Sequence, residues 1–321
     1  MEATSERSWI HRVPFYYGWI VATAGTLGLI MTQPGQSPVL SIFTDAFIEH
    51  LNLSRSLTST LFTIGTVTAG LSLSFWGERI DRHGPRTMVG VITGLFGISC
   101  LYMGLVQNAW MLGVGYVLLR MLGASALMIV SSNVINQWWV ERRGTVMGIS
   151  GVVVALVGMG LFTNLVHGLL QRFDWRTTYV ILGMMELLVM LPLGLLLFRD
   201  RPEDHGLHPD GHLEGRGDLN TGSAAPISWT QGQALRTPAF WVTVASFAAT
   251  SLLGTGLYFH MVSIFESQGL SSNVAAAVYL PISVTSAVVR LGSGYLADRI
   301  PVRILLAVGL IAMSGVLGLA Q

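Results

Sequence analysis

Three ionisable residues, Arg120, Glu186 and Arg290, lie inside long apolar stretches of the sequence. A charged side chain at the centre of a membrane helix costs about 3 kcal/mol or more, so each is expected to face a wet cavity or a partner. A guanidinium group binds a carboxylate through two parallel hydrogen bonds, and a carboxyl group in a dry setting can hold a proton. These residues therefore predict anion binding and proton transfer.

Arg290 has hydroxyl side chains spaced along the same predicted helix. Tyr279, Ser283 and Ser286 precede it by eleven, seven and four residues, which places them on about the same helix face. Arg290 stands eight residues before Asp298, about 12 Å along a helix, too deep for its side chain to reach the membrane surface easily. We expect this set to bind an anionic substrate. The alternative is a structural pairing of Arg290 with a carboxylate or with helix carbonyls.

Arg120 and Glu186 are candidates for proton coupling. Arg120 stands ten residues after Trp110, about 15 Å along a helix, and Glu186 is the only acidic residue well inside an apolar run. A buried carboxyl group is a natural proton site. A structural pairing of the two residues within one bundle remains open.

The sequence T-Q-P-G-Q-S-P, Thr32 to Pro38, lies near the middle of the first apolar run. Two prolines and a glycine are expected to bend or open this helix. The amides of Gln33 and Gln36 could then line a cavity. The alternative is a kink without any ligand contact.

The composition limits the class of protein that holds these residues. Of 321 residues, 51% are hydrophobic and only 11% are charged, less than half the usual charged share. This excludes an ordinary soluble enzyme and a disordered chain. One cysteine excludes a disulfide framework, and a net charge of +1 gives no reason to expect nucleic-acid binding. No nucleotide-binding motif, metal cluster or nucleophile–base set is apparent, so we expect neither a cofactor nor enzymatic activity.

Nine apolar runs are long enough to cross a membrane, which takes about 20 residues. The sequence thus predicts an all-α membrane protein. The runs are Phe15–Phe43, Thr58–Trp76, Thr87–Val106, Trp110–Val134, Thr145–Leu169, Thr178–Phe198, Phe240–Ile264, Asn273–Leu296 and Arg303–Ala320.

The arginines indicate the orientation. With the N-terminus inside, 13 arginines lie in inner segments and 3 in outer loops, so a cytoplasmic N-terminus is expected. A polar stretch from Asp200 to Pro238 separates six helices from three. We therefore expect an N-terminal six-helix bundle (1–199), a cytoplasmic linker (200–238) and a partial C-terminal bundle (239–321).

Two short inner loops repeat each other at a constant offset. G-E-R-I-D-R-H-G-P-R starts at Gly77, and G-Y-L-A-D-R-I-P-V-R starts at Gly294, 217 residues later. Four identities at one offset, in matching topological places, indicate two repeated halves. We expect these loops to latch and release one arrangement of the bundles through their aspartates. The identical pairs are Gly77 and Gly294, Asp81 and Asp298, Arg82 and Arg299, and Arg86 and Arg303.

The first loop resembles the signature of the major facilitator superfamily, G-x-x-x-D-R-x-G-R-R/K. Gly84 keeps the second glycine, Pro85 replaces the first basic residue after it, and Arg86 keeps the second. The second loop has Pro301 where a glycine is usual. Members of this superfamily have twelve helices, so the resemblance implies that about three are missing. Whether the chain is a fragment or a natural truncation stays open.

Three local sequences resemble the oxalate/formate antiporter and monocarboxylate transporter branch: Phe15–Trp19, Asn136–Ile149 and Arg290–Asp298. In that branch the arginine of helix eight binds the substrate carboxylate, and Arg290 has the matching spacing. The family's helix-four arginine has been connected with proton coupling, and Arg120 resembles it.

The resemblance implies a secondary active transporter for a monocarboxylate or dicarboxylate, working by alternating access and coupled to protons or anion exchange. It implies a multi-pass protein of the plasma (inner) membrane that functions as a monomer in the lipid bilayer. One alternative is an exporter of drugs or other metabolites on the same fold. A non-transporting membrane sensor is another.

Overall fold

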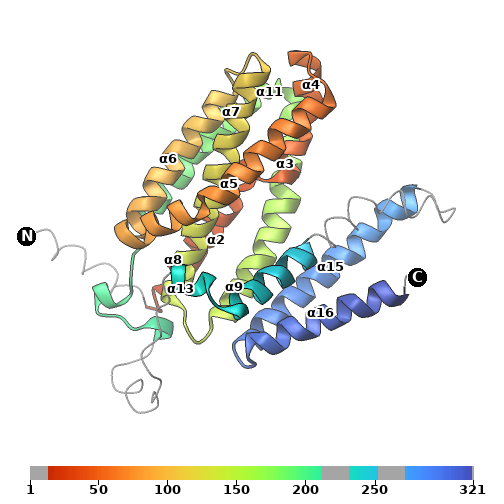
Figure 1. Ribbon diagram of the computed structural model, residues 1–321. Helices are drawn as coiled ribbons and strands as arrows, with labels where there is room; N and C mark the ends of the chain where they lie inside the picture. The colour runs from red at the N-terminus through yellow and green to blue at the C-terminus, as the bar shows by residue number, and fades with distance from the viewer. Residues whose placement is uncertain (1–13, 212–230, 252–271, 320–321) are drawn as a thin grey trace, which may run out of the picture. The chain divides into compact units, whose positions relative to one another are not determined.

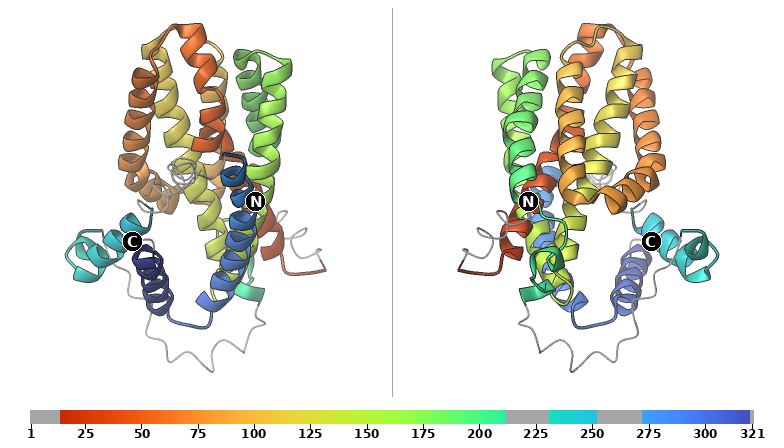
Figure 2. Two further views of the ribbon diagram at one scale, coloured as in Figure 1. Left: turned by 90° about the vertical axis from the view of Figure 1, so that its right-hand side faces the viewer. Right: turned by 90° about the vertical axis from the view of Figure 1, so that its left-hand side faces the viewer.

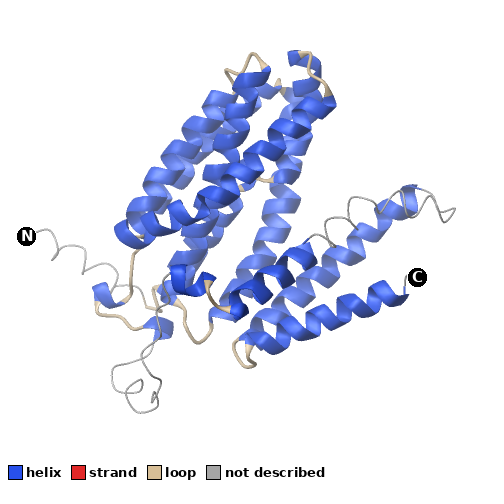
Figure 3. Cartoon of the chain, in the orientation of Figure 1, coloured by secondary structure: helices blue, strands red, loops and turns tan. Residues whose placement is uncertain are grey.

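The structure is a computed structural model that describes residues 14–211, 231–251 and 272–319 (Figure 1). Every regular element within these ranges is a helix (Figure 3), which confirms the all-α prediction. The chain divides into two compact units, Met1–His212 and Leu213–Gln321.

The first unit contains six helical spans, and five of them are continuous helices long and apolar enough to cross a membrane. The first span is broken into α2 (Gly18–Met31), the 3-10 helix η1 (Gln33–Gly35) and α3 (Ser37–Ile42), after which α4 (Thr44–Leu51) leads to the next span. The others are α5 (Arg55–His83); α6 (Pro85–Met103); α7 (Ala109–Leu119), η2 (Arg120–Leu127) and α8 (Met128–Trp138); α9 (Arg143–Val153), η3 (Val154–Phe162) and α10 (Thr163–Arg172); and α11 (Trp175–Met185), η4 (Glu186–Met190) and α12 (Leu191–Leu197).

Local sequence signals start several of these helices. The side chains of Ser54, Asn108 and Asp174 cap α5, α7 and α11, and each accepts a hydrogen bond from the backbone N–H three residues later. Such caps satisfy one of the free N–H groups at a helix start. The spans then pack lengthwise, α2 on α8, α5 on α7, and α6 on α11 and α12 (Figure 2).

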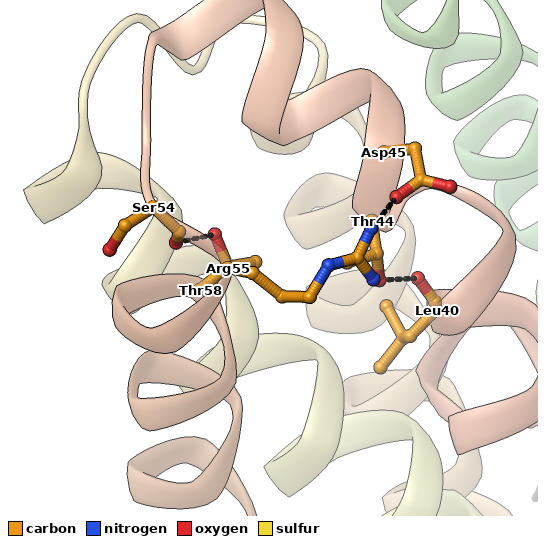
Figure 4. Close-up of polar contacts among 6 residues, drawn as sticks. All are labelled: Leu40, Thr44, Asp45, Ser54, Arg55 and Thr58. Atoms are coloured by element: carbon orange, nitrogen blue, oxygen red, sulfur yellow. Dashed lines mark hydrogen bonds and ion pairs between the residues drawn. The ribbon is translucent and has the colours of Figure 1, made fainter.

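The turn between α4 and α5 is held by polar contacts (Figure 4). Asn52 ends α4 in the left-handed conformation, with φ 51°. Arg55 on α5 then reaches back to Asp45 on α4, with Nη2 and Oδ1 2.6 Å apart. Both side chains are exposed, so this ion pair stabilises the turn by at most about 1 kcal/mol.

The polar segment after α12 begins as part of the first unit. It contains two short 3-10 helices, η5 (Glu203–His205) and η6 (Pro209–Gly211), and the compact unit extends to His212. Residues 199–211 are called the strap below.

The second unit is described over two stretches, 231–251 and 272–319. They contain α13 (Gln231–Leu235), a helix over residues 238–251, α15 (Ser272–Ala297) and α16 (Val302–Leu319). The two latter helices flank the second copy of the repeated loop.

Candidate functional site

The first span is broken where the sequence predicted a bend. Between α2 and α3 the chain turns through η1, Gln33–Gly35, because Pro34 has no N–H to donate and the glycine adds no side chain. This break lies against η2, in the middle of the fourth span. The predicted opening of the helix is thus confirmed.

The fourth, fifth and sixth spans each contain a π-helix. These are η2, η3 and η4, each within a longer α-helix. π-Helical turns are rare and are often found at functional sites. Together with the break in the first span, they show that regular α-helical geometry is interrupted near the middle of four spans.

Gly35 brings the break into direct backbone contact with η2. A Cβ atom at Gly35 would overlap the carbonyl oxygen of Leu119 and lie only 3.1 Å from the amide nitrogen of Ala124. Any larger residue would push the two segments apart. The glycine is therefore required by close approach.

Arg120, the first residue of η2, binds the break. Its Nη1 donates a hydrogen bond to the carbonyl oxygen of Gly35, at 3.0 Å. Its guanidinium carbon lies 5.3 Å from the ring centroid of Phe62, within cation–π range. The buried Nε–H has no acceptor among the described residues. Arg120 thus binds a backbone carbonyl oxygen at the break, and its buried Nε–H stays without an acceptor in the described part of the chain.

The two glutamines of the break differ in environment. Gln33 is buried, with 4% of its surface exposed, and its Oε1 has no donor among the described residues. It packs against Gly158 of η3, where an added Cβ would lie 3.2 Å from Nε2 of Gln33. Gln36 is half-buried and its Nε2 donates to Oγ1 of Thr32, at 3.3 Å.

Glu186 is the first residue of η4, and its carboxyl group is buried. Only 1% of the residue is exposed, and neither carboxyl oxygen has a hydrogen-bond partner within the described ranges. The structure does not show the pairing with Arg120 that the sequence left open. Glu186 is therefore a buried titratable group without a compensating charge in the described part of the chain.

Arg290 lies on α15, seven residues before its end, with an exposed side chain. Its carbonyl oxygen accepts a hydrogen bond from the hydroxyl of Ser293, at 3.2 Å. Tyr279, Ser283 and Ser286 lie on the same helix, but their side chains are outside what the structure describes.

The first repeated loop is bound to the strap at the start of α6. Gly84 ends α5 with φ 80°, a conformation that favours glycine. The backbone N–H of Arg86, at the start of α6, donates to Oδ1 of Asp200, at 2.9 Å. Asp81 is exposed, and its carboxylate accepts no hydrogen bond from a described residue. Asp200, from the strap, thus holds the start of α6 in this conformation.

The remaining residues of this loop are arranged locally. Arg82 pairs with Glu78 one helical turn earlier, with Nη2 and Oε1 2.7 Å apart and both side chains exposed. Gly77 has open space around the position of an added Cβ.

The second repeated loop joins α15 to α16. Gly294 lies within α15, Asp298 and Arg299 form the turn, and Arg303 lies in the first turn of α16. The guanidinium carbon of Arg299 is 4.1 Å from the ring centroid of Tyr295.

The two N-terminal sequences quoted above for the branch resemblance contact one another. Tyr16 donates its hydroxyl to the carbonyl oxygen of Trp138, at 3.0 Å, and its ring lies edge-on to Trp139, with centroids 5.3 Å apart. Trp139 in turn donates its Nε1–H to the carbonyl oxygen of Gly18, at 3.1 Å. Paired aromatic residues at two helix ends were a signal of contact that the sequence reasoning did not use.

The strap is hydrogen-bonded to the end of α8 and to the loop that follows it. The Nε1–H of Trp138 donates to the carbonyl oxygen of Arg199, at 3.1 Å. The carboxylate of Asp210 accepts from three successive backbone N–H groups, those of Val140–Arg142, at 2.8 to 3.1 Å. This anion sits where the fifth span begins, and the sequence reasoning missed it because the partners are about 70 residues apart.

The described residues contain no group of three or more His, Cys, Asp or Glu side chains that could hold a metal ion. The buried polar groups of Gln33, Arg120 and Glu186 are hydrogen-bonding and titratable groups at helix breaks. Such an arrangement can bind an ion or a small polar molecule and can exchange a proton.

Comparisons with known proteins identify the family of this chain. The family model "Major Facilitator Superfamily" matches residues 25–320. The oxalate:formate antiporter of Oxalobacter formigenes is 26% identical over 241 residues, which cover 73% of this chain and 52% of that protein. Monocarboxylate transporter 11 of Mus musculus is 25% identical over 319 residues, covering 94% and 65%. A probable L-galactonate transporter of Escherichia coli (strain K12) is 23% identical, covering 65% and 46%.

The chain therefore spans about half to two thirds of the length of these relatives. Its fold is similar to that of the proton:xylose symporter XylE bound to 6-bromo-6-deoxy-D-glucose, with a TM-score of 0.59, 14% identity, and coverage of 88% of this chain and 70% of that one. At this identity the likeness concerns the fold alone. With the family model matching nearly the whole sequence, this chain belongs to the major facilitator superfamily of membrane transporters.

Proposed function

We propose that the protein is a secondary active transporter that moves a small organic anion, a monocarboxylate or dicarboxylate, by alternating access. The observation that supports this substrate class is Arg290, an arginine inside an apolar run and eight residues before Asp298. Relatives named for oxalate, formate and monocarboxylates agree with it.

Arg290 suits a substrate better than a scaffold. The repeat offset of 217 places Leu73 at the equivalent position of the first half, so the cation is not part of the shared architecture. A guanidinium group in a membrane helix needs an anion or a wet cavity, and its planar fork matches a carboxylate. In this proposal Arg290 holds the carboxylate of the substrate.

Hydroxyl and amide groups orient the bound anion. Tyr279, Ser283 and Ser286 follow the face of α15 that carries Arg290, by helical spacing. Gln33 and Gln36 contribute amide N–H donors from the broken first span. A discontinuous helix at mid-membrane is a common way for transporters to present polar groups.

Glu186 and Arg120 are the proposed coupling residues. An ionised carboxylate costs several kcal/mol when it is buried without a partner, so the buried site of Glu186 suits the neutral, protonated form. A conformation that wets this site would release the proton. Arg120 is bound to the break through the carbonyl oxygen of Gly35.

The two repeated loops are proposed to act as gates at the cytoplasmic side of the plasma (inner) membrane, with the protein working as a monomer. Asp81 and Asp298, with Arg82 and Arg299, would latch one state, and Asp200 holds the start of α6 in the state described above. Release of these contacts would accompany rocking of one bundle against the other.

Uptake by the whole protein in proteoliposomes tests the proposal, with labelled oxalate and formate as probes and xylose as the neutral comparison. Arg290→Ala is expected to lower anion uptake at least tenfold, because each hydrogen bond to a charged group is worth about 1.5–3 kcal/mol. Arg172→Gln, an exposed arginine on α10, should leave uptake unchanged. Wild-type protein that moves neither anion would overturn the substrate class. Anion uptake by Arg290→Ala within twofold of wild type would overturn the site.

A further inference from the structure

A cavity of about 570 Å³ lies between the first half of α6 and the end of the sixth span. One end is polar, formed by Arg86, Thr87 and Asp200, and the other is apolar, formed mainly by Val91 and Leu195. Neither the residues of the break nor Glu186 lines it. None of the roles assigned above uses it as a binding site.

The polar end of the cavity lies at the level where the helices leave the membrane. α6 begins at Pro85, and α12 ends at Leu197, just before Asp200. The expected orientation places this level at the inner leaflet, where basic pockets between spans bind lipid headgroups. The division into a polar and an apolar end thus follows the division of the bilayer itself.

An exposed apolar track continues from the cavity toward the middle of the membrane. Val91, Leu95 and Ile98 lie on one face of α6, at helical spacing, and Leu188 and Leu195 lie on the neighbouring span. All five are at least 41% exposed. From Arg86 to Ile98 the helix rises about 18 Å, close to the roughly 15 Å of hydrocarbon in one leaflet.

We propose that this cavity binds one glycerophospholipid of the surrounding leaflet. Its phosphodiester lies against the guanidinium group of Arg86 and the hydroxyl of Thr87, and one acyl chain follows the track. Asp200 accepts a hydrogen bond from the group beyond the phosphate, so a headgroup with donors, glycerol or ethanolamine, is preferred over choline. A soluble phosphate ion would lack the contacts along the track.

The chemistry of each end supports this occupant. Arginine matches phosphate oxygens through its planar fork, and the adjacent carboxylate would repel a bare phosphate unless the headgroup offers it a donor. Gly90 lets Leu195 lie directly on α6, since a Cβ there would approach the Leu195 side chain to 2.7 Å. This contact forms the floor of the cavity beneath the glycerol region.

Native mass spectrometry of the whole protein, released from detergent with phosphatidylglycerol, phosphatidylethanolamine or phosphatidylcholine, tests the site. Wild type should retain one lipid more than Arg86→Gln, and at least threefold more of the first two lipids than of phosphatidylcholine. Val91→Trp, at an exposed position, should lose the same lipid by filling the track. Arg82→Gln is the control, because Arg82 lies on the same loop but does not line the cavity.

Equal retention by Arg86→Gln and Arg82→Gln would overturn the phosphate contact. Equal retention by Val91→Trp and wild type would overturn the acyl-chain track. Phosphatidylcholine bound as well as the other two lipids would overturn the role of Asp200. Displacement of the lipid by millimolar inorganic phosphate would show that a free anion is the true occupant.

Discussion

Glu186 is a residue whose chemistry is set by burial. Glutamine has nearly the shape of a protonated glutamate, so Glu186→Gln should leave folding intact while removing the proton that the coupling proposal requires. We expect the variant to exchange anion across the membrane at the wild-type rate. Its uptake should no longer rise when a proton gradient is imposed, a loss of at least tenfold in the gradient-driven rate. Paired counterflow and gradient-driven uptake assays measure the two rates.

The comparison within one variant makes this test specific. A variant that is merely misfolded would lose both rates, and an apparent melting temperature well below that of wild type would identify it. Retention of the gradient response by Glu186→Gln would show that coupling resides elsewhere.

At the scale of the helices, the break in the first span depends on Gly35. Gly35→Ala would force its Cβ into the backbone of η2, where neither side can yield like a flexible side chain. Overpacking of this kind costs about 1–3 kcal/mol. The apparent melting temperature should fall, and the hydrogen bond from Arg120 to the Gly35 carbonyl should weaken.

Gly168→Ala provides the matched control. Gly168 lies in α10 with open space around an added Cβ, and alanine favours a helix by about 1 kcal/mol over glycine. This variant should be as stable as wild type or more so. Equal melting temperatures for the two alanine variants would contradict the close contact between η1 and η2.

The start of α11 offers a prediction of pH dependence. Hydrogen bonds from the side chain and backbone of Thr177 hold the pKa of the Asp174 carboxyl below its ordinary value. The folded state therefore favours the ionised cap, whose contribution is full above the ordinary pKa of about 3.9 and is lost as the pH falls below it. Asp174→Ala should cost about 1 kcal/mol at pH 7 and much less near pH 3.

Asn108 caps α7 in the same way but does not titrate in this range. Asn108→Ala should therefore cost a similar amount at both pH values. Thermal unfolding of both variants in detergent compares them. A cost of Asp174→Ala that does not change between pH 7 and pH 3 would mean that the ionised form of the cap has no advantage.

Elements were more predictable from the sequence than contacts. Hydropathy located the spans, and Pro34 and Gly35 located the break, because both signals are local. The π-helices were not predicted, since an inserted residue leaves no mark in an apolar pattern. The contact between Asp200 and the backbone N–H of Arg86 was also not predicted, because an acceptor 114 residues away in sequence cannot be found from spacing within one loop.

At the scale of the whole molecule, the strap belongs physically to the first bundle. Composition placed a linker at residue 200, since polar residues begin there. The compact unit nevertheless extends to His212. Trp138 and the backbone N–H groups of Val140–Arg142 hold the strap through hydrogen bonds to Arg199 and Asp210.

A substitution of Asp210 tests whether its carboxylate holds the strap to the first bundle. Three N–H groups donate to its carboxylate, and a hydrogen bond to a charged group is worth about 1.5–3 kcal/mol, so losing even one bond makes the open strap about tenfold more populated. Protease cleavage of an open segment follows that population. Asp210→Ala should therefore be cut within residues 199–211 at least tenfold faster than wild type in limited proteolysis read by mass spectrometry. Asp204→Ala, in the same strap but exposed, should be cut at the wild-type rate. Equal rates for the two variants would mean that the strap is held without the carboxylate of Asp210.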